Sequence, residues 1–492
     1  MSCAPQSHIV DSRFFSRGYT TAEARRIFCD MRRLQRWLEV EAALASCQAE
    51  LGMIPAEAAR ELGETARLDM LDRDAIREDI ARTGHSLIPL LNAWQRVVSP
   101  GAARYIHYGA TTQDIQDTAQ VMEMRDVLSI LERDTARVIR LLADLAREHR
   151  DLIMIGRTHG QQALPTTFGA KVAVWLDEVL RSAERLHALR ERACAGQLFG
   201  GVGTMAAFGE QGVELLALFC SRLGLSMPLS CWHTARDRHA ETLSAMTLLT
   251  GVLGKIANEI SQLARDEIGE LEEPFHMGKI GSTTMPHKRN PELCEQVVVL
   301  SRLVRNATSL GFEALVSEHE RDYRAIRLEW AACTDASLYA CGALSLMVTI
   351  LEGLIVHRER ISHNVEQAAS LIATEALMFR LAEKMGKQRA HQLLYEISMQ
   401  ARSAGEAAQR SGARQGRRCD DSPLFNLLAD NEEIRQVFTT EELCAAIDPG
   451  RHTGLAGPLT DQVVERAEEL LRERGTQPEP DSCPLEESGI CR

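Results

Sequence analysis

Aromatic residues make up only 5% of the 492-residue sequence, and proline occurs only 15 times. Aromatic residues favour strands and proline interrupts helices, so this composition favours helix over sheet. The chain is also too long for one compact core, which predicts two or three domains.

Long apolar runs are missing as well. The best candidate, 344–356, is interrupted by Glu352, whereas a membrane helix needs about 18 or more apolar residues in succession. The N-terminal stretch lacks the apolar region of a secretory signal. We therefore expect neither a membrane span nor a secretory leader.

The 13 cysteines are scattered, and no two of them form a C-x-x-C pair. Neither a zinc site nor a disulfide framework is indicated, and reduced thiols in a cytoplasmic protein are the simple interpretation. Glycine-rich nucleotide motifs and metal-spaced His/Cys sets are absent too, so no cofactor is expected. The net charge of −13 argues against nucleic acid as a partner, but not against a small anionic substrate.

Long segments without glycine or proline run over 119–155 and 170–195. In the second segment, apolar residues recur in steps of four and three, at Val172, Leu176, Val179, Ala183 and Leu186. A third segment repeats this rhythm at Leu249, Leu253, Ile256, Ile260 and Leu263. Stripes of this length predict an all-α fold built around a bundle of long helices.

Glycine, proline, serine and threonine gather in short clusters, which predict loops at helix ends, at 109–112, 156–167, 200–204 and 278–291. The predicted division is an N-terminal helical domain over 1–112, a central bundle over 113–365 and a C-terminal helical domain over 366–474. Residues 475–492 are rich in proline, glutamate and serine and are predicted to be disordered.

The cluster at 278–291 carries the most chemistry. Two glycines, Gly278 and Gly281, permit backbone conformations closed to other residues, three hydroxyls begin at Ser282, and two cations begin at Lys288. Asn290 is then placed as the N-cap of a helix that starts with proline and glutamate. A cation beside a helix N-terminus is a natural carboxylate site. On pattern alone, a glycine-rich connector before a capped helix stays an equal alternative.

This stretch resembles the signature of the fumarase/aspartase superfamily, G-S-S-x-M-P-x-K-x-N-P. Each specified position matches except the second serine, which is Thr283 here. The resemblance implies that Ser282 is a general base, acting as an alkoxide on a loop that closes over the substrate. Lys288 and Asn290 would bind a substrate carboxylate. A serine hydroxyl is too weakly acidic for this role unless backbone N–H groups and the nearby cation stabilise its anion.

Two further regions resemble the other characteristic segments of the superfamily. In the I-H-Y-G-A-T-T-Q-D segment, Thr111 and Thr112 would donate hydrogen bonds to a substrate carboxylate. The G-R-T-H-G-Q-Q segment resembles the form found in adenylosuccinate lyases, where Thr158 would touch the substrate and His159 would be the general acid. A loop histidine alone is more often structural, and the T-H-G-Q context favours catalysis.

Two more residues are placed by the same resemblance. Glu295 matches an acidic residue that orients this histidine, and a carboxylate on one ring nitrogen fixes its tautomer. His85 resembles another histidine on the substrate side. The resemblance covers roughly residues 10–470 and implies a three-domain helical protomer that forms a homotetramer through its central helices. Each active site would take its loops from three different subunits.

The positions that hold a nucleotide phosphate in adenylosuccinate lyases are altered. Gly18 stands in place of an arginine, and Ile326 and Trp330 replace a serine and an arginine after the E-R-D motif at 320–322. Isoleucine donates no hydrogen bond and indole offers one neutral donor. Two charge-assisted contacts, worth roughly 1.5–3 kcal/mol each, are lost, so a nucleotide substrate is disfavoured.

The segment 231–238 and the Glu-Trp pair at 329–330 look instead like bacterial 3-carboxy-cis,cis-muconate cycloisomerases. On this likeness Arg236 is expected to bind substrate. Core packing stays an equal alternative for Trp232 and Trp330. Those cycloisomerases have tryptophan where this chain has His159, so this chain differs from them at the position of the expected general acid.

The combination is similar to lyases of small substituted succinates, such as nitrosuccinate lyases. The leading hypothesis is β-elimination from an N-substituted or nitro-substituted succinate, a small dicarboxylate, with release of fumarate. Cycloisomerisation of carboxymuconate is the first alternative and adenylosuccinate cleavage the second. A purely structural role, as in lens crystallins related to argininosuccinate lyase, is disfavoured because Ser282, Lys288, Asn290 and His159 are intact.

Overall fold

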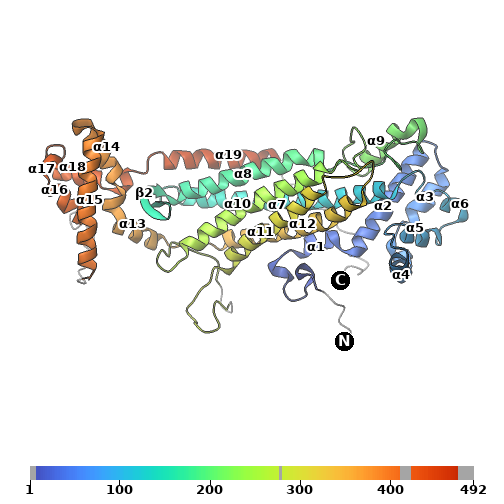
Figure 1. The fold of residues 1–492 in the computed structure, drawn as a ribbon, viewed down its shortest axis with the longest axis horizontal. Coiled ribbons are helices and arrows are strands. Elements are labelled where there is room, and N and C mark those ends of the chain that lie inside the picture. The colour runs from blue at the N-terminus through green and yellow to red at the C-terminus, as the bar shows by residue number, and fades with distance from the viewer. Residues whose placement is uncertain (1–6, 276–279, 411–422, 475–492) are drawn as a thin grey trace.

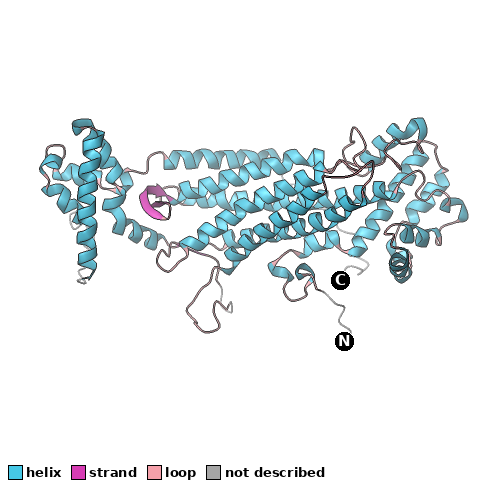
Figure 2. Cartoon of the chain, in the orientation of Figure 1, coloured by secondary structure: helices cyan, strands magenta, loops and turns pink. Residues whose placement is uncertain are grey.

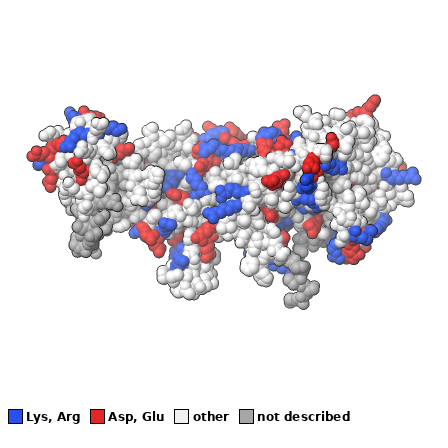
Figure 3. Space-filling model, viewed as in Figure 1, with Lys and Arg blue, Asp and Glu red and all other residues white. Residues whose placement is uncertain are grey.

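The computed structural model describes residues 7–275, 280–410 and 423–474. The molecule is elongated, and helices make up nearly all of its regular structure (Figure 1, Figure 2). The predicted all-α class is therefore confirmed. On the face drawn in Figure 3, acidic and basic side chains are interspersed along the molecule.

Five long helices form the central bundle. They are α7 (Thr112–Glu148), α8 (Phe168–Ala193), α10 (Asp237–Leu263), α11 (Glu292–Glu313) and α12 (Tyr323–Glu352). Both predicted apolar stripes lie in its core, where Leu176 and Val179 of α8 and Leu249 and Leu253 of α10 are fully buried. Burial of each such side chain stabilises the fold by roughly 1.5–3 kcal/mol, so the stripes hold these helices together.

Helix α12 is long and apolar enough to cross a membrane by length and composition alone. However, 72% of its most apolar window is buried inside the protein. A helix surrounded by other helices has to be apolar on most of its faces, so packing in the bundle accounts for this composition.

The segment 156–167 forms a hairpin and not the loop that we predicted. Strand β1 (Ile153–Thr158) pairs antiparallel with β2 (Gln161–Thr167). Helix α7 consequently ends at Glu148, although the sequence lacks glycine and proline as far as 155. Strand geometry buries Met154 and Ile155 against the neighbouring helices. A second short pair joins β3 (Leu271–Glu272) and β4 (Ile355–Val356).

Shorter helices extend the molecule at both ends of the bundle. The N-terminal part contains α1 (Ala22–Phe28), α2 (Asp30–Glu50), α3 (Ala56–Thr65), α4 (Arg73–Thr83), α5 (Ile88–Gln95) and α6 (Pro100–Ala103), and α9 (Gly212–Arg222) lies beside it. The opposite end carries α13 (Arg358–Ile372), α14 (Thr374–Met385), α15 (Lys387–Arg410), α16 (Pro423–Asp430), α17 (Glu432–Arg435) and α18 (Thr440–Ala446). This distal unit, α13–α18, has a small core of its own that includes Leu381, Phe425 and Leu428.

The last helix, α19 (Ala456–Arg474), leaves the distal unit and runs back along α7 and α8 (Figure 1). Its Val464, Ala467 and Leu470 belong to the core of the bundle. The segment predicted as one C-terminal domain over 366–474 thus has its helices in two different cores. The tail over 475–492 lies outside the described residues.

The distal unit also contacts the β1–β2 hairpin. Ile155 of β1 forms a separate apolar cluster with Val365, Ala368 and Ile372 of α13. Hairpin and distal unit are therefore packed together at one end of the bundle.

Candidate active site

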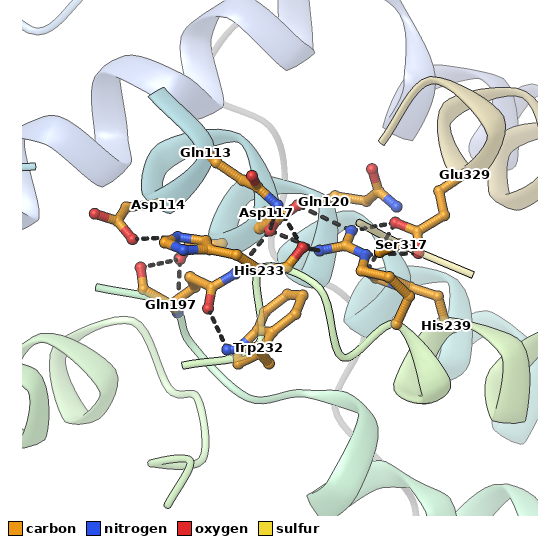
Figure 4. A network of polar contacts seen from close by, with 12 residues as sticks. Gln113, Asp114, Asp117, Gln120, Gln197, Trp232, His233, His239, Ser317 and Glu329 are labelled. Carbon is orange, nitrogen blue, oxygen red and sulfur yellow. Dashed lines mark hydrogen bonds and ion pairs between the residues drawn. The ribbon is translucent and has the colours of Figure 1, made fainter. Parts of the chain in front are cut away.

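The N-terminal end of α7 is the meeting point of three loops, which are held together by Asp114 (Figure 4). Its buried carboxylate accepts hydrogen bonds from the backbone N–H groups of Thr111 (3.0 Å), Phe199 (3.0 Å) and Gly200 (2.9 Å). Nε2 of His233 lies 2.9 Å from the Asp114 carboxylate. A buried carboxylate with this many donors fixes the relative positions of the loops that supply them.

Arg321 lies against this junction. Its guanidinium donates to the Thr111 hydroxyl (2.7 Å) and to the Gly201 carbonyl. A guanidinium, a threonine hydroxyl and the N-terminus of a long helix together can bind a carboxylate. We predicted Thr111 and Thr112 here but missed Arg321. The only signal was the E-R-D motif at 320–322, which we used solely to judge phosphate binding.

His85 lies at the same end of the bundle. The neighbouring Ser86 accepts a hydrogen bond from Gln116 of α7 (2.7 Å). The Nδ1 atom of His85 accepts from the backbone N–H groups of Leu87 (3.3 Å) and Ile88 (3.1 Å). An accepting Nδ1 places the proton of the neutral ring on Nε2, which is left to meet a ligand.

Arg236 does not face the solvent at this junction of loops, which corrects the prediction that it binds substrate. Its side chain is buried, at 1% exposure. The guanidinium pairs with Asp117 (2.8 and 3.0 Å) and with Glu329 (2.8 Å from Nε). Since its N–H groups all face buried acceptors, Arg236 has no donor left for a substrate. It connects α7, α10 and α12 instead.

The two tryptophans of the cycloisomerase-like segments are packing residues. Trp232 is buried, and its indole N–H donates to the Gly196 carbonyl (2.9 Å). The ring of Trp330 lies 6.1 Å from that of Trp37. Ile326 is buried where adenylosuccinate lyases have a phosphate-binding serine, which adds to the case against a nucleotide.

The signature loop leaves the bundle between β3 and α11. The Asn290 side-chain amide donates to the Gly281 carbonyl (2.6 Å), and the Lys288 carbonyl lies so close to Gly281 that a Cβ there would collide with it. The loop is thereby closed at its base, which explains the need for glycine at this position. Gly278 lies outside the described residues.

Asn290 is not the helix cap that we predicted, because its side chain is engaged inside the loop. The carboxylate of Glu273 accepts instead from two N–H groups in the first turn of α11, those of Leu293 (3.1 Å) and Cys294 (2.9 Å). A carboxylate at a helix N-terminus is favourable. Glu273 therefore fixes the start of α11 relative to the loop.

Within the loop, the Ser282 Oγ accepts from the backbone N–H groups of Thr284 (3.3 Å) and Met285 (3.0 Å). Two donors on one hydroxyl oxygen favour negative charge there. Lys288 is exposed, and among the described residues it has no ion-pair partner. The loop thus presents a polarised hydroxyl and a cation that is available to a ligand.

His159 and Gly160 form the two-residue tip of the β1–β2 hairpin, with φ of +52° and +74°. Positive φ at both positions is the type I′ turn, whose twist matches that of a hairpin. Thr158 and His159 are exposed at this tip. Arg157 anchors the hairpin through a pair with buried Glu270 (2.7 Å).

The predicted site residues fall into separate places within one chain. Helix α7 has 37 residues and spans about 55 Å at 1.5 Å per residue. Thr111 precedes its first residue, and the hairpin lies at the opposite end of the bundle (Figure 1). Glu295 is exposed on α11, and no hydrogen bond joins it to His159 within the described residues. Thr111 and His159 of one chain cannot contact the same small molecule.

A family model described as "Lyase" matches residues 17–305, more than half of the chain. The chain belongs to the fumarase/aspartase superfamily. A second family model, "Adenylosuccinate lyase C-terminus", matches residues 370–463. The superfamily prediction from the signature is thus confirmed.

Relatives in this superfamily match along nearly the whole chain. An N-acetyl-S-(2-succino)cysteine lyase of Dickeya dadantii is 40% identical over 94% of this chain and 98% of its own length. That of Enterococcus italicus is 39% identical over 93% and 97%. The crystal structure of the 3-carboxy-cis,cis-muconate lactonizing enzyme from Pseudomonas putida is 32% identical with a TM-score of 0.83, covering 93% of this chain and 99% of that one.

The Asp114–His233 contact predicts a pH-dependent stability. Burial lowers the pKa of His233, but hydrogen bonds to Asp114 and Cys231 outweigh this and raise it to about 9. A raised pKa contributes stability that is complete below pH 6.5 and lost as the pH rises through 9, worth about 3 kcal/mol. We expect chemical denaturation at fixed protein concentration to show this decrease. The His233→Gln protein should lack it, and equal pH dependence in both proteins would contradict the assignment.

Proposed function

We propose that this chain catalyses β-elimination from a substituted succinate and releases fumarate. The observation that carries the proposal is the signature loop, in which Ser282 Oγ accepts two backbone N–H groups (3.3 and 3.0 Å). The two relatives with the highest identity given above are named for a succinate joined through sulfur to cysteine. A thiol is therefore a third candidate for the leaving group, beside the amine and the nitrite that the sequence suggested.

In the proposed reaction, Ser282 removes a proton from the carbon next to one carboxylate. The electron pair forms the double bond of fumarate, and the bond between the other carbon and the leaving group breaks. Negative charge builds up on the first carboxylate in the transition state, where facing cations and N–H donors stabilise it. Lys288 and Asn290 of the loop would supply this stabilisation.

The junction at the start of α7 would hold the other carboxylate. Arg321 already donates to the Thr111 hydroxyl (2.7 Å), and Thr112 begins the helix. Charge-assisted hydrogen bonds of this kind orient a carboxylate as well as bind it.

His159 would protonate the leaving group, oriented by Glu295 of another subunit. An amine leaves poorly without a proton, whereas a thiol has an ordinary pKa of about 8.5 and departs readily as thiolate. The need for His159 therefore depends on the leaving group, and is smaller for a sulfur-linked substrate.

We further propose a cytoplasmic homotetramer whose active sites combine segments from three subunits. The length of α7, about 55 Å, supports the sharing of sites between subunits, because Thr111 and His159 of one chain lie beyond the two ends of this helix. A neighbouring subunit has to supply whichever element the first one lacks.

A substrate comparison tests the reaction. Fumarate formation, followed by ultraviolet absorbance, is expected with N-acetyl-S-(2-succino)cysteine, and at a lower rate or not at all with adenylosuccinate. Nitrosuccinate serves as the test of a nitrite leaving group. Turnover of 3-carboxymuconate with no fumarate from any substituted succinate would favour the cycloisomerase and overturn the proposal.

Replacement of the base tests the role of the loop. Ser282→Ala should lower kcat by roughly 10²- to 10⁴-fold, the usual contribution of a general base, and leave the mass of the assembly unchanged in light scattering. Thr283→Ala, one residue away on the same loop, is the matched control and should retain most activity. Unchanged turnover in Ser282→Ala would refute the assignment.

Mixed assemblies test the shared site. Ser282→Ala and Arg321→Gln chains should each be nearly inactive alone. If the two residues of one site come from different subunits, co-expression should restore about a quarter of wild-type activity, since half of the sites receive an intact Ser282 and half of those an intact Arg321. Mixed assemblies without any recovery would show that both residues come from one subunit.

A further inference from the structure

A cysteine, a histidine and an aspartate form a chain of contacts beside the start of α7. We call the surface there, with Arg321 and Thr111, the carboxylate surface, because it is suited to bind a carboxylate. The Sγ of Cys231 lies 3.1 Å from Nδ1 of His233, and Nε2 of His233 lies 2.9 Å from Asp114. The His233 and Asp114 side chains are completely buried, whereas Cys231 is partly exposed. The proposed elimination makes no use of this thiol.

The charge on His233 favours a reactive form of the sulfur. With a pKa of about 9, the buried ring is a cation at neutral pH, held in place by Asp114. A cation in hydrogen-bond contact with sulfur stabilises the thiolate, which is the nucleophilic form of cysteine. The other charged groups nearby form a separate set, in which Arg236 is shared by the carboxylates of Asp117 and Glu329.

The thiol belongs to the same loops as the carboxylate surface. Arg321 donates to the carbonyl of Gly201, and Gly203 follows two residues later with φ of +84°. A Cβ on Gly203 would lie 2.9 Å from the Cys231 sulfur, so a side chain there would press on the thiol. Glycine at this position leaves room for the sulfur beside a surface that is suited to carboxylates.

We propose that Cys231 is a nucleophilic thiol that adds unsaturated dicarboxylates, fumarate among them. The thiolate attacks one alkene carbon, the S–C bond forms as the π bond breaks, and the other carbon takes a proton from water. The product is a succinated Cys231, and the addition needs no oxidant or reductant. This inference rests on the proposed function, which supplies fumarate, and it means that the reaction product modifies the enzyme beside its own substrate site.

The test uses the full-length wild-type assembly with two alkylating probes, uncharged N-ethylmaleimide and fumarate. Peptide mass spectrometry follows each cysteine over time. Because Cys231 is in contact with the His233 ring, it should react with maleimide roughly tenfold faster or more than the partly exposed Cys29 and Cys444. Fumarate should add to Cys231 ahead of the same two residues. Equal maleimide rates at the three cysteines would overturn the proposal, and maleimide labelling without a fumarate adduct would overturn its dicarboxylate part.

Two variants separate the causes. His233→Gln keeps a hydrogen-bond donor but removes the cation, so the rate at Cys231 should fall to that of Cys29, and an unchanged rate would overturn the role of His233. Where this variant does not fold, the wild-type comparison decides alone. Ser282→Ala should label like wild type, because the addition needs no turnover. Loss of the elimination and loss of the thiol reactivity are therefore distinguishable.

Discussion

The loops at the start of α7 depend on one set of interactions, the hydrogen bonds to the buried carboxylate of Asp114. It sits at the start of α7 and takes hydrogen bonds from three backbone N–H groups and from His233. A carboxylate without water is costly unless donors surround it, so these loops are stable only in the arrangement that satisfies it. One turn further along the helix, the buried carboxylate of Asp117 accepts hydrogen bonds from the Arg236 guanidinium. The first two turns of α7 therefore position both the loops at its start and the buried arginine beneath them.

The length of α7 then sets the scale of the enzyme. A helix of 37 residues separates the carboxylate surface at one end from the hairpin at the other by about 55 Å. Under the proposed function, a site built from both would have to be assembled between chains, and folding of a single subunit would not be sufficient for activity. In such an assembly, a change that weakens contacts between bundles would lower activity without touching a reacting group.

Much of this could be predicted from the sequence, because periodicity reports burial directly. The stripes at 172–186 and 249–263 gave the bundle, and the signature gave a loop with Ser282 at its centre. Periodicity cannot tell a short apolar strand from the end of a helix, so the hairpin at 153–167 was missed. Residue type alone also could not show that the donors of Arg236 face buried carboxylates, or that Arg321 reaches Thr111 across 210 positions of sequence. Such pairings exist only once the chain is folded.

The return of α19 to the bundle has a mechanical consequence. The distal unit joins the rest of the protein through two chain connections, one before α13 and one after α18, and it shares a small apolar cluster with β1. A body attached in this way is held to the bundle at several points, since Arg360 and Asn364 of α13 also donate to the Ile268 carbonyl. Through Ile155 it packs against the hairpin whose tip carries His159. The distal unit therefore braces the strand pair that presents this histidine.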